Sequence, residues 1–219
     1  MAELIVVRHT THADIPHIVD IQSRVYAGVG VWDREHLEQQ LDAFPQGQVV
    51  ACLGSRVVGA ASSLIIRWDD WGVWHSWDEV TGKGTFSTHS PGGRTLYGAE
   101  VFADPAMRRL GIGAKLYGAR RRICRAFNLR RVMACGRMPN YHTYASRYSP
   151  EEYAMRVIWG DVEDPVLLFQ LREGFHYCGI NRGYLPWDDD SLGNATVIVW
   201  LNKHFKPGRP DAVIEGGVL

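Results

Sequence analysis

The stretch 100–116 restricts the fold of this chain more than any other part of its sequence. It joins the end of an apolar strand pattern over 96–103 to the start of a strong helical pattern over 111–127, which opens on Gly111 and Gly113. Glycines at a helix start leave backbone amides facing outward without β-carbons beside them, and the helix dipole adds partial positive charge there. The stretch therefore predicts a strand–turn–helix unit with an anion site that suits a pyrophosphate.

Two common phosphate-binding loops do not fit this stretch. The third glycine of a G-x-G-x-x-G dinucleotide motif would fall on Leu116, and the P-loop pattern G-x-x-x-x-G-K-[ST] does not occur. The pattern that remains is R-x-x-G-x-G, which runs from Arg108 to Gly113. This argues against the dinucleotide-binding and P-loop classes.

Hydrophobic periodicity and turn residues predict the other elements. Thr11 or Asp14 caps a first helix that runs to Val25, and Asp33 caps a second that closes at Pro45. The expected strands are 4–8, 48–53, 56–67, 96–103, 129–135, 175–180 and 196–201, and further helices are expected over 111–127, 150–159 and 165–171.

With this order of elements, the R-x-x-G-x-G segment resembles the GNAT acyl-CoA N-acyltransferase superfamily over most of residues 4–201. The resemblance is closest to the acetyltransferase domain that in some proteins precedes a carbon–nitrogen hydrolase domain, through segments 136–141, 164–167 and 191–195. It implies an α/β (mixed α+β) GNAT fold: a central, mostly antiparallel sheet of about six or seven strands, splayed in the middle, with helices on both faces. We expect a single domain over 1–205 and a C-terminal tail over 206–219.

The resemblance also implies acetyl-CoA as the acyl donor. Backbone amides at the helix start would bind its pyrophosphate, the preceding strand edge would pair with its pantetheine arm, and nearby cations would balance its charge. The residues implied for this binding are Val101, Phe102, Ala103, Arg108, Arg109, Leu110, Gly111, Ile112, Gly113, Ala114, Lys115 and Asn140. Because a β-carbon would block the phosphate, we expect valine at either glycine to abolish binding and leave the fold largely intact.

Acetylation of an amine requires a base that takes the amine proton and a group that protonates the departing thiolate. Glu100 lies where the family often places the base, although a structural carboxylate paired with an arginine is an equal alternative. The place of the family's acidic tyrosine is held by Gln170, and an insertion over 137–163 comes before its helix. Tyr141 and Tyr144 are the alternative candidates near the thiolate, and the reaction can also proceed without a dedicated acid because a CoA thiolate is a fair leaving group.

The acceptor pocket is expected in the long loop 68–94 and near residue 26. Tyr26, Trp77, Asp78 and His89 are the candidate substrate-binding residues, because ring faces and carboxylates together hold a cationic amine. Each tryptophan of the loop can instead belong to a satellite core, and each histidine can be packed or solvated.

Charge and composition exclude several other classes. Lys and Arg together number 24, as do Asp and Glu, so there is no general positive field for nucleic acid or an anionic membrane. No apolar run approaches the roughly 20 residues of a membrane span. Neither the four cysteines nor the histidines show metal-ligand or disulfide spacing, so we expect no metal and buried reduced thiols.

The sequence thus predicts a cytoplasmic N-acetyltransferase acting on a primary amine of a small molecule or peptide. The start of the chain lacks a secretory signal, no nucleic-acid or membrane partner is expected, and a homodimer is left open. The alternative is a non-catalytic acyl-CoA-binding or regulatory module of the same fold. A less favoured alternative is a nucleic-acid patch formed by helix arginines expected to lie mostly off the apolar stripe, with two more beyond the helix: Arg120, Arg121, Arg122, Arg125, Arg130 and Arg131.

Overall fold

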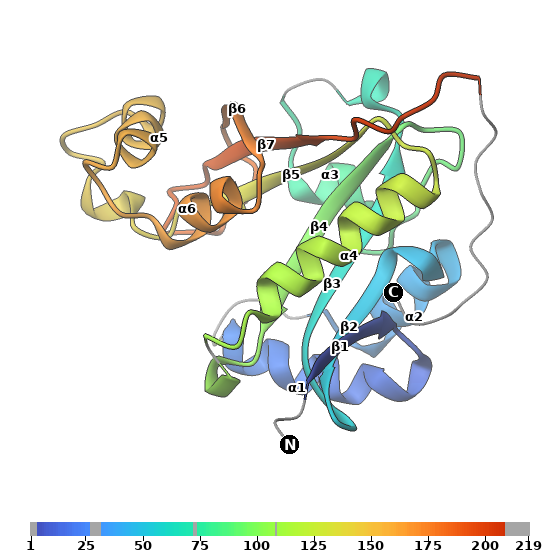
Figure 1. The fold of residues 1–219 in the computed structure, drawn as a ribbon. Coiled ribbons are helices and arrows are strands. Elements are labelled where there is room, and N and C mark those ends of the chain that lie inside the picture. The colour runs from blue at the N-terminus through green and yellow to red at the C-terminus, as the bar shows by residue number, and fades with distance from the viewer. Residues whose placement is uncertain (1–3, 27–31, 72–73, 108, 209–219) are drawn as a thin grey trace.

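The computed structural model describes residues 4–26, 32–71, 74–107 and 109–208. Its strands form one sheet in the order β1-β2-β3-β4-β5-β7-β6 (Figure 1). All neighbouring strands are antiparallel except β4 and β5, which are parallel, so the mixed, mostly antiparallel sheet predicted from the sequence is confirmed. The strands are β1 (Ile5–His9), β2 (Gln48–Leu53), β3 (Arg56–Ile66), β4 (Thr95–Ala103), β5 (Arg131–Arg137), β6 (His176–Asn181) and β7 (Ala195–Leu201).

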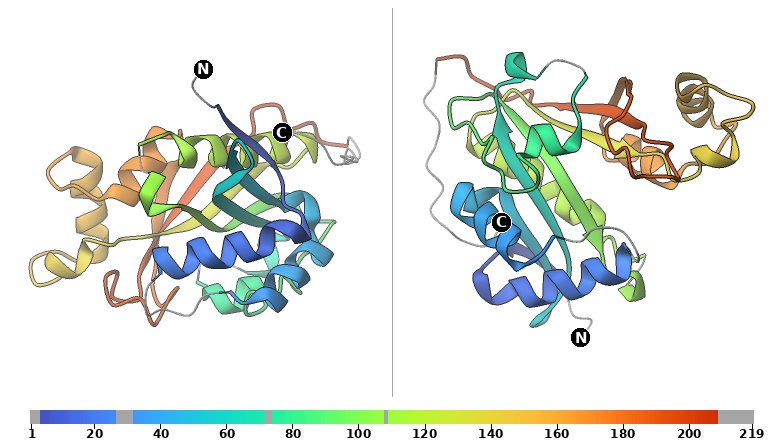
Figure 2. Two further views of the ribbon diagram at one scale, coloured as in Figure 1. Left: turned by 90° about the horizontal axis from the view of Figure 1, so that it is seen from below. Right: turned by 180° about the vertical axis from the view of Figure 1, so that it is seen from behind.

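Helices cover both faces of this sheet. On one face α4 lies along β2, β3 and β4, and on the other α1 crosses β3 and β4 with α2 beside it (Figure 2). The helix α6 contacts β5, and α5 contacts α6 and β6, at the end of the sheet that projects away in Figure 1. The α-helices are α1 (Ile15–Val25), α2 (Arg34–Ala43), α3 (Trp77–Thr81), α4 (Ile112–Ala126), α5 (Pro150–Trp159) and α6 (Pro165–Arg172).

The core consists of two clusters because successive residues of a strand face opposite sides of the sheet. In β2, Val49 and Ala51 pack under α4, whereas Val50 and Cys52 pack under α1. Both faces of the central strands are therefore apolar, which is why β2 and β3 read as nearly continuous apolar runs. Within the described residues, no helix is both long and apolar enough to cross a bilayer.

Both predicted helix starts are confirmed, but only the second has a side-chain cap. The Asp33 side chain accepts a 3.0 Å hydrogen bond from the amide of His36, whereas Asp14 precedes Ile15 without capping α1 through its side chain and instead accepts from the Thr11 amide at 2.8 Å. The short helix α3 in the long loop after β3 was not predicted. Its cap, Ser76, exchanges hydrogen bonds with Glu79 in a capping box.

The expected insertion between β5 and α6 is folded as a short 3₁₀ turn (Tyr141–Thr143) followed by α5. The Tyr153 hydroxyl donates a 2.7 Å hydrogen bond to Asp164, whose other oxygen caps α6. The insertion is thus fixed to the first turn of α6. Cys52 and Cys124 are buried as expected, whereas Cys178 is exposed; all four cysteines are free.

Candidate active site

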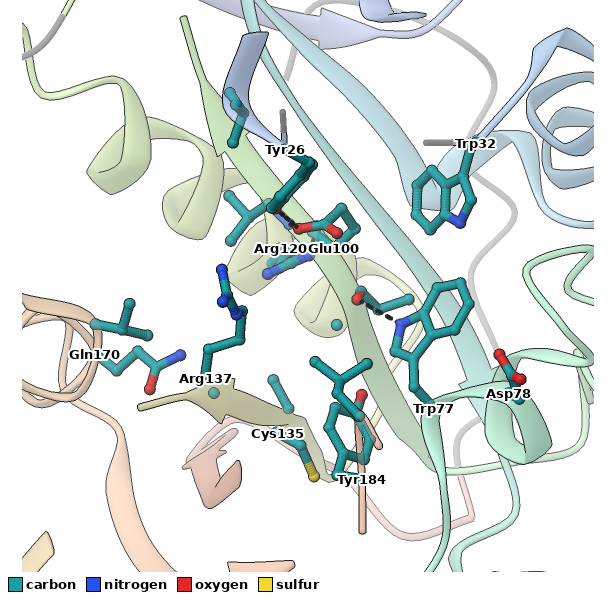
Figure 3. A pocket seen from close by; sticks show the side chains of 18 of the residues that line it. Tyr26, Trp32, Trp77, Asp78, Glu100, Arg120, Cys135, Arg137, Gln170 and Tyr184 are labelled. Carbon is teal, nitrogen blue, oxygen red and sulfur yellow. Dashed lines mark hydrogen bonds between the residues drawn. The ribbon is translucent and has the colours of Figure 1, made fainter. Parts of the chain in front are cut away.

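The parallel strands β4 and β5 diverge shortly after they pair. Their pairing covers only residues 95–98 of β4 and 131–134 of β5, after which β4 continues beside β3 and β5 beside β7. The facing edges beyond that point have lost their partner strand. A cavity of about 640 Å³ occupies this gap and is lined by both strands and by α4 and α6 (Figure 3).

Glu100 lies on the free edge of β4 and lines the cavity. Its Oε1 accepts a 2.7 Å hydrogen bond from the Tyr26 hydroxyl and a 2.8 Å hydrogen bond from the Val101 amide (Figure 3). Burial raises the pKa of Glu100 above the ordinary carboxyl value, although these two hydrogen bonds oppose the rise. A carboxyl group with such a pKa, facing a cavity, is suited to accept a proton near neutral pH.

Arg120 reaches the floor of the cavity from α4 and is only 2% exposed. Its Nε donates to Ser63 Oγ at 3.1 Å, and its Nη2 donates to the carbonyl oxygens of Ser62 and Glu100. Among the described residues, no carboxylate lies within ion-pair distance of this guanidinium. Burial lowers the pKa of Arg120. Only neutral oxygen atoms accept hydrogen bonds from this charged group among the described residues.

The sequence interpretation that placed Arg120 off the apolar stripe of its helix is wrong. The residue faces the sheet because Gly98 in β4 leaves room for it: a β-carbon at Gly98 would lie 3.0 Å from the guanidinium carbon. The serine pair in β3 supplies the acceptors that make burial of the charge tolerable. Arg120 is therefore buried and does not belong to a surface patch of arginines.

The opposite wall comes from the segment between β6 and β7. Arg137, at the end of β5, donates from Nε to Asp188 at 2.7 Å and from Nη2 to the other oxygen of the same carboxylate. The Met138 amide donates to Ser191 Oγ at 2.9 Å. These contacts hold the segment against β5, and Tyr184 and Trp187 from it line the cavity.

Aromatic rings form the mouth of the cavity beside α3. The rings of Trp32 and Trp77 stack with centroids 5.7 Å apart, and the Trp77 indole donates a 3.1 Å hydrogen bond to the carbonyl of Ala99 in β4. Asp78 lines the same end of the cavity (Figure 3). Ring faces and a carboxylate thus lie near one another at this end, as the sequence predicted for Trp77 and Asp78.

The turn between β4 and α4 is fixed by a buried carboxylate. Asp104 is fully buried, accepts from the Ala106 amide at 3.0 Å and forms ion pairs with Arg24 and Arg56 at 2.9 Å and 2.8 Å. Burial raises the pKa of Asp104, but these contacts outweigh it, so the pKa lies below the ordinary value. These contacts fix the residues that directly follow β4.

The two glycines at the start of α4 differ in their surroundings. Gly111 has a φ of +71° with open space where a β-carbon would lie, whereas a β-carbon on Gly113 would come within 3.0 Å of the Phe169 ring on α6. Valine at Gly113 would therefore press on the Phe169 ring of α6 and should lower stability as well as donor binding. The open space at Gly111 agrees with a site that an anion can approach.

The comparisons with known proteins agree with this geometry. A family model described as "Acetyltransferase (GNAT) family" matches residues 15–146, which is more than half of the chain. The chain belongs to the GNAT acetyltransferase family. A GNAT-like decarboxylase, GphF, solved in complex with isobutyryl-CoA, superposes with a TM-score of 0.76 at 25% identity over 89% of this GNAT chain and 98% of that one.

Two relatives come from Bacillus subtilis (strain 168). The probable hydrolase YhcX is 40% identical over 92% of this GNAT protein, which spans only 39% of the YhcX length. The uncharacterized N-acetyltransferase YkwB is 29% identical over 93% of this chain and 92% of its own length. The loading GNATL domain of CurA from Lyngbya majuscula shares the fold, with a TM-score of 0.79 at 20% identity over 90% of this chain and 97% of that one.

The structure brings most of the predicted site residues of this GNAT protein together. Glu100, Val101, Tyr26, Trp77 and Asp78 all line the cavity. Most of the other residues predicted to bind the donor lie along the end of β4 and the start of α4, directly after Glu100 and Val101 in the chain: Phe102, Ala103, Arg109, Leu110, Gly111, Ile112, Gly113, Ala114 and Lys115. Arg108 lies outside the described residues.

Three predicted residues are not at the cavity. Tyr141 is buried in the core, where its hydroxyl donates to the carbonyl of Tyr148 at 3.2 Å. The side-chain Nδ2 of Asn140 donates to the carbonyl of Glu163 at 3.0 Å. His89 accepts from the Ile65 amide at 3.1 Å and stacks on Phe44, 4.6 Å between centroids. Burial lowers the pKa of His89. The structure therefore does not bring these three together with Glu100.

The structure also adds residues that were not predicted for the site: Arg120, Arg137, Tyr117 and Tyr184. Only Arg120 has a signal in the sequence, because Gly98 and the serine pair in β3 leave room and acceptors for a long polar side chain. Within the described residues, no group of His, Cys, Asp or Glu side chains is arranged to hold a metal ion.

Proposed function

We propose that this GNAT protein is an acyl-CoA-dependent N-acyltransferase that moves an acetyl group from acetyl-CoA to a primary amine. The observation that carries the proposal is the position of Glu100. Its carboxylate lies on the free edge of β4, inside the cavity between the splayed strands, and burial raises its pKa. A base is thus placed beside the strand edge that the resemblance gives to the pantetheine arm.

Different residues of the chain bind the donor, accept the proton and position the base. The edge of β4 beyond Glu100 offers unpaired backbone groups to the amides of the donor, and the first amides of α4 face its phosphates. Glu100 accepts the proton of the attacking amine, as the new C–N bond forms and the C–S bond breaks. Tyr26 holds the Glu100 carboxylate toward the cavity through its 2.7 Å hydrogen bond.

The acceptor that fits best is a cationic primary amine on a small molecule or peptide. Trp77 and Trp32 offer ring faces, and Asp78 offers a carboxylate, at the open end of the cavity. Cations are attracted to ring faces when they lose water, and a carboxylate adds charge pairing. A cationic amine first releases one proton to solvent, and the neutral amine then gives a second proton to Glu100 as it attacks.

The test begins with acetyl-CoA alone. Saturating acetyl-CoA, at about 100 times its dissociation constant, adds roughly 2.7 kcal/mol to the unfolding free energy, which a thermal melt detects as a higher Tm. A panel of amines is then assayed by release of the CoA thiol. Acetyl-CoA binding with no turnover on any amine would instead support a non-catalytic acyl-CoA-binding module.

A second candidate function is decarboxylation of a carboxylated acyl-CoA. The observation that favours it is the buried Arg120 guanidinium without a carboxylate partner, and the GphF structure described above is of a GNAT-like decarboxylase. Arg120 would hold the acyl carboxylate until the C–C bond breaks, CO₂ leaves and the carbon takes a proton. Incubation with malonyl-CoA tests it: formation of acetyl-CoA and CO₂, lost in Arg120→Met, would support this function.

A further inference from the structure

A buried tyrosine of α4 has no part in the reaction derived so far. Tyr117 lines the cavity and is 1% exposed. Its ring packs edge-on against Phe169 and Phe175, with centroids 5.0 Å and 5.2 Å away. This packing fixes the ring, so its hydroxyl has a defined position at the cavity wall.

The partner of this hydroxyl is Gln170 on α6. Gln170 Nε2 donates to Tyr117 Oη at 3.3 Å, so the tyrosine oxygen accepts here and its own proton is not used in this bond. Within the part of the chain that the structure describes, no hydrogen bond takes up the Tyr117 hydroxyl proton. That proton is available to a group inside the cavity.

A second observation that points to a ligand is the unpaired side-chain oxygen of Gln170. The residue is 4% exposed and lines the cavity, and its Oε1 has no hydrogen-bond partner among the described residues. Gly136 of β5 makes room for the amide, since a β-carbon there would lie 2.4 Å from Oε1. Because an unpaired buried acceptor is costly, a bound molecule with an N–H or O–H donor is the fitting partner.

The charges around Tyr117 keep it protonated and close to a cation. The titratable groups that face it are Arg120 on its own helix, Glu100 on β4 and Glu173 after α6, and the Arg120 guanidinium carbon lies 5.4 Å from its ring centroid. Burial raises the pKa of Tyr117, against the opposing effects of Arg120 and Gln170. The phenol therefore holds its proton at neutral pH.

Acyl transfer releases a thiolate into this same cavity. Cys135 also lines the cavity, and burial raises the pKa of its thiol to about 11. The surroundings therefore disfavour the ionised form of a sulfur atom. A thiolate released there is disfavoured for the same reason. A nearby proton donor therefore helps the C–S bond to break.

We propose that Tyr117 donates its proton to the sulfur leaving group, with Gln170 as the residue that positions it. The proposal rests on the acyltransferase function proposed above. The amine nitrogen bonds to the carbonyl carbon, the C–S bond breaks, and the sulfur takes the Tyr117 proton while Glu100 takes the amine proton. Afterwards the proton on Glu100 leaves and Tyr117 regains one, through cavity solvent.

The first test measures binding and needs no acceptor. Wild-type protein and Tyr117→Phe are titrated with CoA and with desulfo-CoA by calorimetry. The phenylalanine keeps the aromatic packing, so the variant should fold. We expect the wild type to bind CoA about fivefold more tightly than desulfo-CoA, the size of one neutral hydrogen bond of about 1 kcal/mol, and the variant to lose that preference. An unchanged preference in the variant would overturn the proposal.

The second test measures turnover with acetyl-CoA and hydroxylamine, a small general acceptor, with Tyr141→Phe as the matched control because Tyr141 is buried away from the cavity. We expect Tyr117→Phe to lose about 10²-fold in kcat, the lower range for general acid catalysis, with acetyl-CoA affinity within threefold. The control should match the wild type. A kcat of Tyr117→Phe within threefold of the wild type would overturn the proposal and leave the acyltransferase function standing.

A third variant separates positioning from packing. Gln170 donates to Tyr117 Oη and so lowers the pKa of that phenol, and Gln170→Leu removes this effect. We expect the alkaline fall in kcat to move to higher pH in Gln170→Leu and to disappear in Tyr117→Phe. A wild type that neither binds CoA nor releases thiol would overturn both the function and this inference, whereas identical alkaline limbs in all three proteins would overturn the inference alone.

Discussion

The Tyr26 hydroxyl donates a 2.7 Å hydrogen bond to Oε1 of Glu100, and so joins the end of α1 to the free edge of β4. This bond favours the ionised carboxylate and opposes the effect of burial on its pKa. Burial and the Tyr26 hydrogen bond therefore shift the pKa of Glu100 in opposite directions. Removing either effect should change this pKa.

Removing the Tyr26 hydroxyl tests this relationship. Tyr26→Phe deletes a hydrogen bond that lowers the pKa of Glu100, so that pKa rises further above its ordinary value. A base must be deprotonated to act, so the acidic limb of kcat/KM should move to higher pH. The pH profile of thiol release measures it. An acidic limb that stays in place, or moves to lower pH, would show that Glu100 does not set it.

The acceptor end of the cavity predicts a charge preference. Asp78→Asn removes the carboxylate near Trp77 and should raise KM for a cationic primary amine by about tenfold, the value of one charge-assisted hydrogen bond. Hydroxylamine, which is uncharged at neutral pH, serves as the control acceptor, and its KM should stay within twofold. An equal rise for both acceptors would mean that Asp78 acts through the fold.

The two glycines at the start of α4 should give different results. Gly111→Ala forces a left-handed backbone on alanine, which costs about 1 kcal/mol, and leaves the surroundings unchanged. Gly113→Val pushes into Phe169 and should cost about 1–3 kcal/mol as overpacking. Denaturant unfolding measures both free energies, and a Gly113→Val protein as stable as the wild type would contradict the packing described.

Asp104 predicts an acid-dependent stability. Its pKa lies below the ordinary value when folded, so its contribution to the unfolding free energy is present above the unfolded-state pKa and is lost as pH falls through the folded-state pKa. Asp104→Asn should lower the unfolding free energy by about 2 kcal/mol at neutral pH, because the carboxylate's hydrogen bonds to Arg24 and Arg56 are lost. The difference from the wild type should shrink in acid, and a constant difference would refute this assignment.

Local signals in the sequence predicted most of the fold. The capping side chain of Asp33, the Gly54-Ser55 turn and the apolar stripe of α4 act within a few residues of the chain, and the elements that they predict are confirmed. The short helix α3 was not predicted. Its five residues show too little periodicity, and its start depends on the capping box at Ser76.

The candidate site was predicted only where one segment carries it. Glu100 and the start of α4 belong to a single strand–turn–helix unit. Arg120 was misplaced because its burial depends on Gly98 and Ser63, residues of two other strands. Tyr117 was missed for a similar reason: its hydroxyl gains a role only through Gln170, 53 residues further along the chain.

Whether Glu100 is the base is decided by the pH dependence of thiol release from acetyl-CoA, with hydroxylamine as acceptor, in the wild type and in Glu100→Gln. We predict that kcat/KM of the wild type rises with pH through the pKa of Glu100, which lies above the ordinary carboxyl value. Because hydroxylamine itself loses a proton in the acidic range, kcat/KM is calculated on its uncharged form; in Glu100→Gln it should then be about 10²-fold lower and lack that rise, with acetyl-CoA affinity preserved. The same profile and rate in both proteins would contradict the account, because the base would then be another group.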